Sequence, residues 1–272
     1  MIGAFPTVNS MSAFALGKPG EPLGAFVAAY VAIEIGRLVS GKTKVDIIVT
    51  PFVTICVGVL LSLGCAPAIG AAASTVGTAI MWATELQPFF MGIIVSVIVG
   101  IALTLPISSA AICAALSLTG LAGGAAVAGC CAQMVGFAVM SFKENKWGGL
   151  FAQGIGTSML QMGNIVRNPR IWLPPTLASA ITGPVATCIF HLKMNGAAVA
   201  SGMGTCGLVG QIGVYTGWVN DIAEGTKAAI TGMDWAGLVL ICFILPAVLS
   251  WAIAIPMRKC GWIKENDLKL DL

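Results

Sequence analysis

GGLFAQGIGTSMLQMGNIVRNPRIWLPP, residues 148–175, is hydrophobic enough to lie at membrane depth, yet polar side chains interrupt it. These side chains are the amide and guanidinium groups of Gln153, Gln161, Asn164, Arg167, Asn168 and Arg170. Hydrocarbon does not solvate such groups, so each needs a protein partner or a water-filled cavity. The stretch therefore predicts a segment that enters the membrane inside protein and ends at a polar site where a hydroxylated solute binds.

The composition is that of an integral membrane protein. Of the 272 residues, 57% are hydrophobic and 9% are charged, whereas soluble domains have roughly 25% charged residues. Between Asp46 and Lys143 the one charged residue is Glu85, and the apolar runs on both sides suit helices of about 20 residues. We predict an all-α integral membrane protein, a polytopic bundle of about eight hydrophobic segments with re-entrant or broken helices.

Turn residues and basic loops divide the apolar sequence into expected segments. A helix over residues 22–38 carries Glu34 and Arg37 on one face, close enough to pair. Further spans are expected over residues 45–63, 88–105, 171–190 and 235–257. Pro51 should interrupt the first of these spans, which ends at residues 64–67. Pro184 should kink the third.

Segments rich in glycine and other small residues do not fit a straight span. Either 106–119 or 120–142 is expected to be a half-helix that enters the membrane and returns. Residues 196–218 contain seven glycines and are expected to be re-entrant or broken. We predict one transmembrane domain over residues 1–260 and a short cytoplasmic tail over residues 261–272.

Motifs that the sequence lacks argue against several function classes. There is no G-x-x-x-x-G-K-[ST] phosphate-binding loop, which disfavours an ATP-driven pump. The one histidine, His191, has no aspartate at membrane depth with which to build a Ser-His-Asp triad, and the nine cysteines form no C-x-x-C pair. We expect no cofactor, no metal site, no catalytic residue in this chain alone and no nucleic-acid partner.

Glu85 and Gln87 form a polar island between two apolar segments. A carboxylate in this position is costly unless it has a purpose or a partner. The functional interpretation is hydrogen bonding to substrate hydroxyls or proton transfer. The alternative places Glu85 at the water interface beside Gln87 and Pro88.

Asn164, Arg167 and Asn168 form a second polar tip. Their planar amide and guanidinium groups match vicinal hydroxyls or a phosphate. We expect this tip to face the tip over residues 84–88 across a cavity. In the alternative interpretation Arg167 and Arg170 anchor a helix end on the cytoplasmic side, and the substrate-binding set is then reduced to Glu85, Gln87 and His191.

His191, together with Asn195, is the third candidate for substrate binding. The alternative is an ordinary histidine at the membrane interface.

Three runs of the sequence resemble a known family: TELQPFFMGIIVSVIVGIALTLPISSAAICAAL, MLQMGNIVRNPRIWLPP and GLVGQIGVY. They are similar to the membrane IIC component of bacterial phosphotransferase-system permeases, in the branch of stand-alone IIC-like proteins that also includes a regulator of toxin expression in clostridia. The resemblance covers residues 44–218. Members usually begin with a further hydrophobic stretch, so the start of this chain is expected to be truncated relative to the family.

The resemblance implies a dimeric, multi-pass carrier in the bacterial inner membrane that binds a sugar in a cavity formed by re-entrant hairpins and broken helices. A membrane glutamate and a histidine near the substrate are important in such carriers, and Glu85 and His191 are the residues able to fill those roles here. Phosphoryl transfer would come from separate soluble IIA and IIB proteins. The alternative functions are a membrane sensor or regulator, or a facilitator that works without partners.

Overall fold

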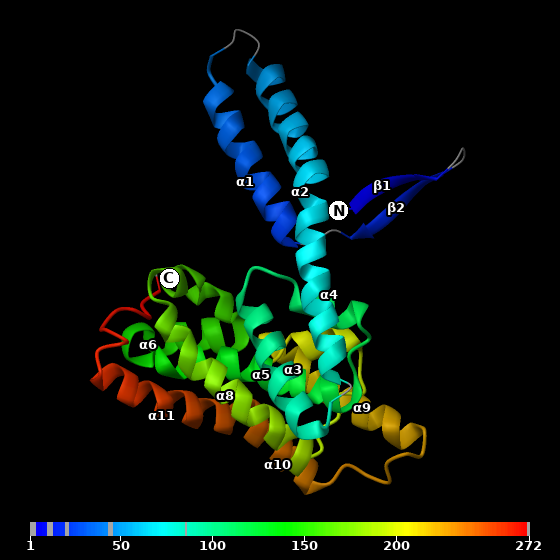
Figure 1. Ribbon diagram of the computed structural model, residues 1–272, viewed down its shortest axis with the longest axis vertical. Helices are drawn as coiled ribbons and strands as arrows, with labels where there is room; N and C mark the ends of the chain where they lie inside the picture. Colours follow the sequence, from blue (N-terminus) through cyan, green and yellow to red (C-terminus); the bar gives the residue numbers. More distant parts are fainter. Residues whose placement is uncertain (1–3, 10–12, 20–21, 43–45, 85, 271–272) are drawn as a thin grey trace. The chain divides into compact units, whose positions relative to one another are not determined.

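In the computed structural model, residues 4–9, 13–19, 22–42, 46–84 and 86–270 are described (Figure 1). They divide into two compact units, with the boundary between Thr75 and Val76. Among these residues the fold is helical apart from one short hairpin in the first unit. The predicted class of an all-α membrane bundle with broken helices is therefore confirmed, with the hairpin as an addition.

The first unit is a hairpin of strands followed by a hairpin of helices. Strands β1 (Ala4–Asn9) and β2 (Ala13–Pro19) pair antiparallel. Helix α1 (Pro22–Val39) then packs on the first part of α2 (Asp46–Thr84) through small residues, because Gly36 lies against Thr54 and Gly58 against Ala32.

Two predictions for the first unit have different outcomes. The predicted ion pair within α1 is confirmed, with 3.1 Å between Arg37 Nη1 and Glu34 Oε1. The predicted helix end at residues 64–67 is wrong, since α2 continues without a break to Thr84. The reason lies in the residues that follow Pro67: they are rich in alanine, the residue with the highest helix propensity, and they carry the helix past the proline.

The second unit is built around helix α5 (Gly120–Met140), which is almost wholly buried. Helices α3 (Pro88–Thr104), α8 (Leu173–Pro184) and α11 (Leu245–Lys259) pack on it. Glycines allow these helices to approach closely: a Cβ at Gly129 of α5 would collide with the Ser96 carbonyl of α3, and one at Gly183 of α8 with the Gly92 carbonyl. Small residues at helix contacts are typical of bundles in lipid.

Beside these helices lie the broken segments. Helix α4 (Ser109–Ala115) is short and lies in the first of the two segments for which a half-helix was predicted, and it packs on the 3-10 turn η5 (Ala198–Gly202). The Ser109 hydroxyl donates to the Gly202 carbonyl, 2.7 Å away. A second 3-10 turn, η6 (Cys206–Leu208), leads into helix α9 (Val209–Ala223). The prediction that residues 196–218 are broken is thus confirmed.

The polar stretch over residues 148–175 is also broken into short pieces. After α6 (Phe142–Phe151) come a π-turn, η1 (Ala152–Gly156), and a 3-10 turn, η2 (Ser158–Gln161). Helix α7 (Met162–Arg167) and the turn η3 (Pro169–Trp172) then lead into α8. The fully buried amides of this stretch bind each other, because Gln161 Nε2 donates to Gln153 Oε1 at 2.9 Å.

The last elements surround the end of α9. The π-turn η4 (Val185–Ile189) follows Pro184 in α8, where a kink was predicted. Helix α10 (Gly232–Val239) and the π-turn η7 (Leu240–Ile244) continue into α11. Within the described ranges two helices are long and apolar enough to cross a membrane, Gly120–Met140 and Gly232–Lys259, while Ile48–Leu61 and Pro88–Thr104 are apolar but shorter.

Candidate functional site

A polar pocket of about 470 Å³ opens where η4, α9 and α10 come together. Most of the side chains around it are hydroxyl-binding groups or aromatic rings. Its lining includes Phe190, His191, Lys193, Asn195, Trp218, Asp221, Glu224, Thr226, Lys227 and Asp234. Ligand pockets start at roughly 300 Å³, so a small polar solute fits.

The backbone before α9 forms one wall of this pocket. At His191 the chain leaves the helical path with φ of +45°, a left-handed value that is uncommon for a residue other than glycine. The next residues run across α5, where Met194 and Gly120 exchange two backbone hydrogen bonds of 3.0 Å. This sharp turn leaves the His191 side chain exposed at the pocket.

Two polar pairs hold the other wall. Asn195 Nδ2 donates to both carboxylate oxygens of Asp221, at 2.9 and 3.0 Å. Lys227 Nζ lies 2.6 Å from Asp234 Oδ1 and 5.2 Å from the centre of the Trp218 ring. The carboxylate and amide groups of this wall suit the hydroxyls of a small polar solute, while the Trp218 ring, 3% exposed, lies behind Lys227 and supports the wall.

Sequence reasoning identified only part of this pocket. His191 and Asn195 were candidates for substrate binding. Asp221, Lys227 and Asp234 lie in residues 219–234, which the sequence predicts to be a polar connector. The available signal was the charge density of that stretch: residues 221–234 hold four charged side chains in a chain that is only 9% charged.

Gln87 lies at the same end of the second unit as His191. It is exposed just before α3, and the next residue, Pro88, accepts a 2.8 Å hydrogen bond from the Thr187 hydroxyl in η4. The start of α3 is therefore held against the segment that leads to His191. Glu85 lies outside the described residues, so its role stays a prediction.

Asn164 and Asn168 lie elsewhere and bind the C-terminal segment. Asn164 Nδ2 donates to the Lys269 carbonyl at 2.8 Å. Asn168 Nδ2 donates to the Trp262 carbonyl at 2.9 Å and to Asp267 Oδ2 at 2.7 Å. Arg167, in the same segment, is exposed to the surroundings.

The two polar tips do not face each other, and this corrects the expectation of a shared cavity. At the first residue of α3, the Pro88 carbonyl accepts a hydrogen bond from Thr187. At the last residue of α3, the Thr104 hydroxyl lies 2.9 Å from the Ser158 hydroxyl. The helix has 17 residues and is about 25 Å long. The tip before α3 and the tip after Ser158 are therefore at opposite ends of the second unit.

The segment that follows α11 is a part of the fold that the sequence did not reveal. Ile263 and Leu268 are buried in a cluster with Phe137 of α5 and Ile171 of η3. At the surface, Lys143 Nζ donates a 2.6 Å hydrogen bond to Glu265, and this bond lowers the pKa of the Glu265 carboxyl. Residues 261–270 are thus attached to the second unit, although the prediction was a tail separate from the domain.

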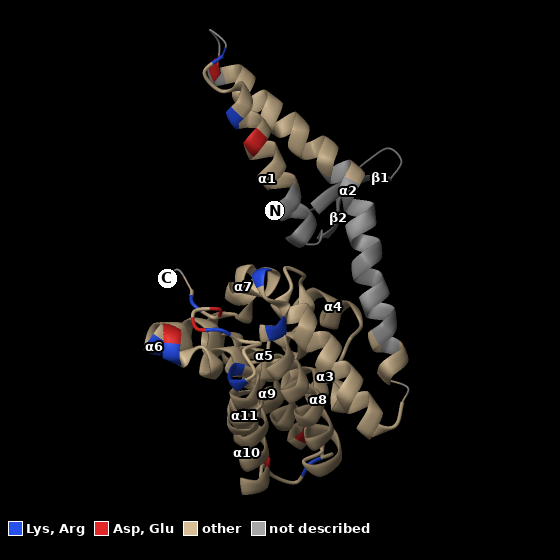
Figure 2. Cartoon of the chain, turned by 60° about the vertical axis from the view of Figure 1, so that its left-hand side comes forward, with Lys and Arg blue, Asp and Glu red and all other residues tan. Residues whose placement is uncertain are grey.

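Basic side chains gather at the end that holds this C-terminal segment. Figure 2 shows Lys and Arg around α6, α7 and the C-terminus. In the sequence these are Lys143, Lys146, Arg167, Arg170, Arg258, Lys259, Lys264 and Lys269, and they outnumber the neighbouring acidic residues Glu144, Glu265 and Asp267. The polar pocket end has instead His191, Lys193, Asp221, Glu224, Lys227 and Asp234. The two ends of the unit therefore differ in charge.

Comparison with known protein families gives a match. A family model described as "Phosphotransferase system, EIIC" matches residues 1–270. The search of curated proteins and the search of solved structures found no match.

Proposed function

Since the chain belongs to the phosphotransferase system EIIC family, we propose that it is the membrane-embedded, sugar-binding permease subunit of a phosphoenolpyruvate-dependent system. It is a multi-pass protein of the bacterial inner membrane and works as a homodimer. Its role is to move a carbohydrate-like solute across that membrane. The phosphoryl group comes from separate soluble IIA and IIB proteins, so this chain binds and moves the solute and is not catalytic by itself.

The observation that carries this proposal is the polar pocket at His191. It combines carboxylate, amide and imidazole groups, which exchange hydrogen bonds with hydroxyls, with the nearly buried ring of Trp218. The pocket contains both cations and carboxylates, and Lys227 and Asp234 neutralise each other across 2.6 Å. A neutral sugar suits such a balanced pocket better than an ion of either sign.

The charge difference between the two ends supports a proposed orientation of the second unit. Basic residues near membrane spans remain on the cytoplasmic side. On this basis the end with Arg167 and Arg170 faces the cytoplasm, and the pocket at His191 opens on the outer side, where the solute arrives. The proposed binding set is then Glu85, Gln87 and His191, extended by Asn195 and Asp221.

A matched pair of variants tests the place of the site. We expect Asp221→Asn to weaken sugar binding about tenfold or more, because a hydrogen bond to a charged group contributes about 1.5–3 kcal/mol. Asn164→Ala, at the other end of the unit, should leave binding unchanged. Titration of the purified protein with a broad panel of sugars, followed by the part of the tryptophan fluorescence that Trp218→Phe removes, measures both.

Each outcome bears on a different part of the proposal. If Asn164→Ala weakens binding and Asp221→Asn does not, the site lies at the basic end. If no sugar of the panel binds, the chain is not a sugar permease and a sensor of another small solute becomes the better assignment. Sugar uptake by proteoliposomes that contain this chain and no soluble partner would show a facilitator.

A further inference from the structure

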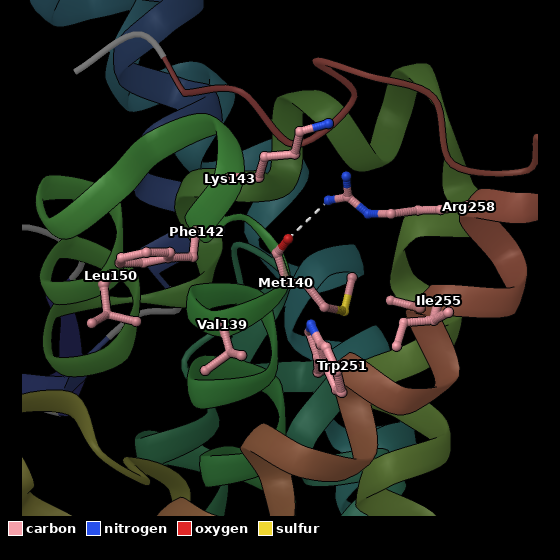
Figure 3. A pocket seen from close by; sticks show the side chains of 9 residues that line it. Val139, Met140, Phe142, Lys143, Leu150, Trp251, Ile255 and Arg258 are labelled. Carbon is pink, nitrogen blue, oxygen red and sulfur yellow. Dashed lines mark hydrogen bonds between the residues drawn. The ribbon is translucent and has the colours of Figure 1, made fainter.

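A second pocket, apolar and of about 620 Å³, lies where α5, α6 and α11 meet at the basic end of the second unit (Figure 3). Its walls are hydrocarbon and aromatic groups, with two cations among them. The lining comprises Val139, Met140, Phe142, Lys143, Leu150, Trp251, Ala254, Ile255 and Arg258. The polar solute site described above has no residue in common with it.

The walls suit a flexible apolar chain. Val139 and Met140 belong to α5, Leu150 belongs to α6, and Trp251 and Ile255 belong to α11. Trp251 is 56% exposed, so the pocket opens sideways on the face that a membrane protein presents to lipid. An acyl chain in this pocket would bury apolar surface on both sides.

The two cations lie at one rim of the pocket, as Figure 3 shows for Lys143 and Arg258. Arg258 is fixed, because Nη1 lies 2.9 Å from Glu144 Oε1 and Nη2 lies 2.9 Å from the Met140 carbonyl. Lys143 pairs with Glu265, but the two side chains are 67% and 80% exposed. Such an exposed pair is worth little, so Lys143 is available to another anion.

Aromatic residues on α6 place this rim at the level of the lipid headgroups. The Trp147 ring packs edge-to-face on Phe142 and stacks on Phe151, and all three side chains are exposed. Exposed tryptophans beside lysines are typical of the membrane–water interface. The cations therefore lie at headgroup depth and the apolar walls lie deeper.

We propose that this pocket binds an anionic glycerophospholipid. Its phosphate is held by Lys143 at the rim beside Arg258, whose Nη1 and Nη2 bind Glu144 and the Met140 carbonyl. One acyl chain lies along Val139, Trp251 and Ile255. Lysine and arginine near a bilayer surface each contribute about 1 kcal/mol to the binding of anionic lipid. A zwitterionic lipid lacks the net charge on which this selectivity depends.

Fluorescence quenching by lipid distinguishes a bound lipid from the bulk bilayer. The full chain is reconstituted in phosphatidylcholine vesicles with increasing mole fractions of phosphatidylglycerol brominated on its acyl chains, and brominated phosphatidylcholine serves as the comparison. Subtraction of the signal of Trp251→Phe isolates Trp251 from the other six tryptophans. We expect half-maximal quenching of Trp251 at a lower mole fraction of the phosphatidylglycerol than of the phosphatidylcholine.

Two single-charge variants complete the test. Lys143→Gln should raise the mole fraction of brominated phosphatidylglycerol needed for half-maximal quenching about fivefold. Lys259→Gln removes the same charge next to Arg258, from an exposed residue outside the pocket lining, and should leave the curve unchanged. Lys143 and Glu265 are both exposed, so Lys143→Gln should fold normally.

Three results would overturn the proposal. Equal quenching of Trp251 by the two brominated lipids would mean contact with bulk bilayer only. An equal loss in Lys143→Gln and Lys259→Gln would mean a general surface charge effect. Protection of Trp251 from both lipids would mean that protein, such as a second copy of the chain, covers the pocket.

Discussion

At the scale of single residues, His191 combines an unusual backbone conformation with a position at the polar pocket. Its φ of +45° costs a residue with a Cβ roughly 1–2 kcal/mol, a cost that glycine does not have. Residues held in such conformations often lie at functional sites. The imidazole is therefore a better candidate for solute contact than an ordinary interface histidine would be.

A comparison of two variants separates the side chain of His191 from its backbone. His191→Ala keeps the backbone strain and removes the imidazole, whereas His191→Gly removes both. We expect His191→Gly to be about 1 kcal/mol more stable than His191→Ala in thermal unfolding in detergent. Both variants should lose the same factor in sugar affinity. A large difference in affinity between them would show that the shape of the turn, and not the imidazole, supports binding.

At the scale of elements, glycine contacts determine how closely the helices of the second unit pack. Gly129→Ala in α5 should destabilise the protein by about 1–3 kcal/mol, because the new methyl group collides with the Ser96 backbone and forces α3 away. Gly163→Ala is the matched control: the same methyl group in α7 meets nothing within 4 Å, and alanine favours a helix. Thermal unfolding of both variants measures the difference. Equal stability would mean that α3 and α5 do not pack at these glycines.

The attachment of the C-terminal segment to α7 and η3 leads to a prediction about proteolysis. Asn168→Ala removes the hydrogen bonds to the Trp262 carbonyl and to Asp267, so trypsin should cleave after Lys264 several times faster. Arg167→Ala should leave this cleavage unchanged, since Arg167 is an exposed neighbour. Mass spectrometry of the released C-terminal peptide gives the rate. A rate that is unaffected by Asn168→Ala would mean that the buried Ile263 and Leu268 alone hold the segment.

The sequence predicted the elements better than it predicted their contacts. Apolar length and proline positions located α3 and the change from α-helix to π-turn after Pro184, and glycine content identified the broken stretch over residues 196–218. The attachment of the C-terminal segment was missed because Ile263 and Leu268 belong to a short segment rich in charges, without helical periodicity. The opposite placement of the two polar tips was missed because it depends on the direction of α3 between them, a tertiary property.

At the scale of the whole molecule, the two proposed sites lie at different ends of the second unit. The polar pocket at His191 is at one end, and the basic end with the apolar pocket is at the other. The proposed solute site and the proposed lipid site therefore do not compete for the same residues. The side of the membrane on which each site lies depends on the orientation of the chain, and an experiment on intact cells and inverted vesicles decides it.

Labelling of cysteines with a membrane-impermeant maleimide tests the orientation. Cys260 is exposed at the basic end, while Cys113, Cys130 and Cys242 are buried and should not react. We expect the reagent to label Cys260 only in inverted vesicles, and Cys260→Ser should remove that label. Cys188 in η4 is also exposed, so it is replaced by serine in this experiment. In that background Glu224→Cys places a new thiol at the polar pocket, and it should be labelled in intact cells. Labelling of Cys260 from outside would reverse the orientation and place the His191 pocket in the cytoplasm, where it would face the soluble phosphocarriers and not the incoming solute.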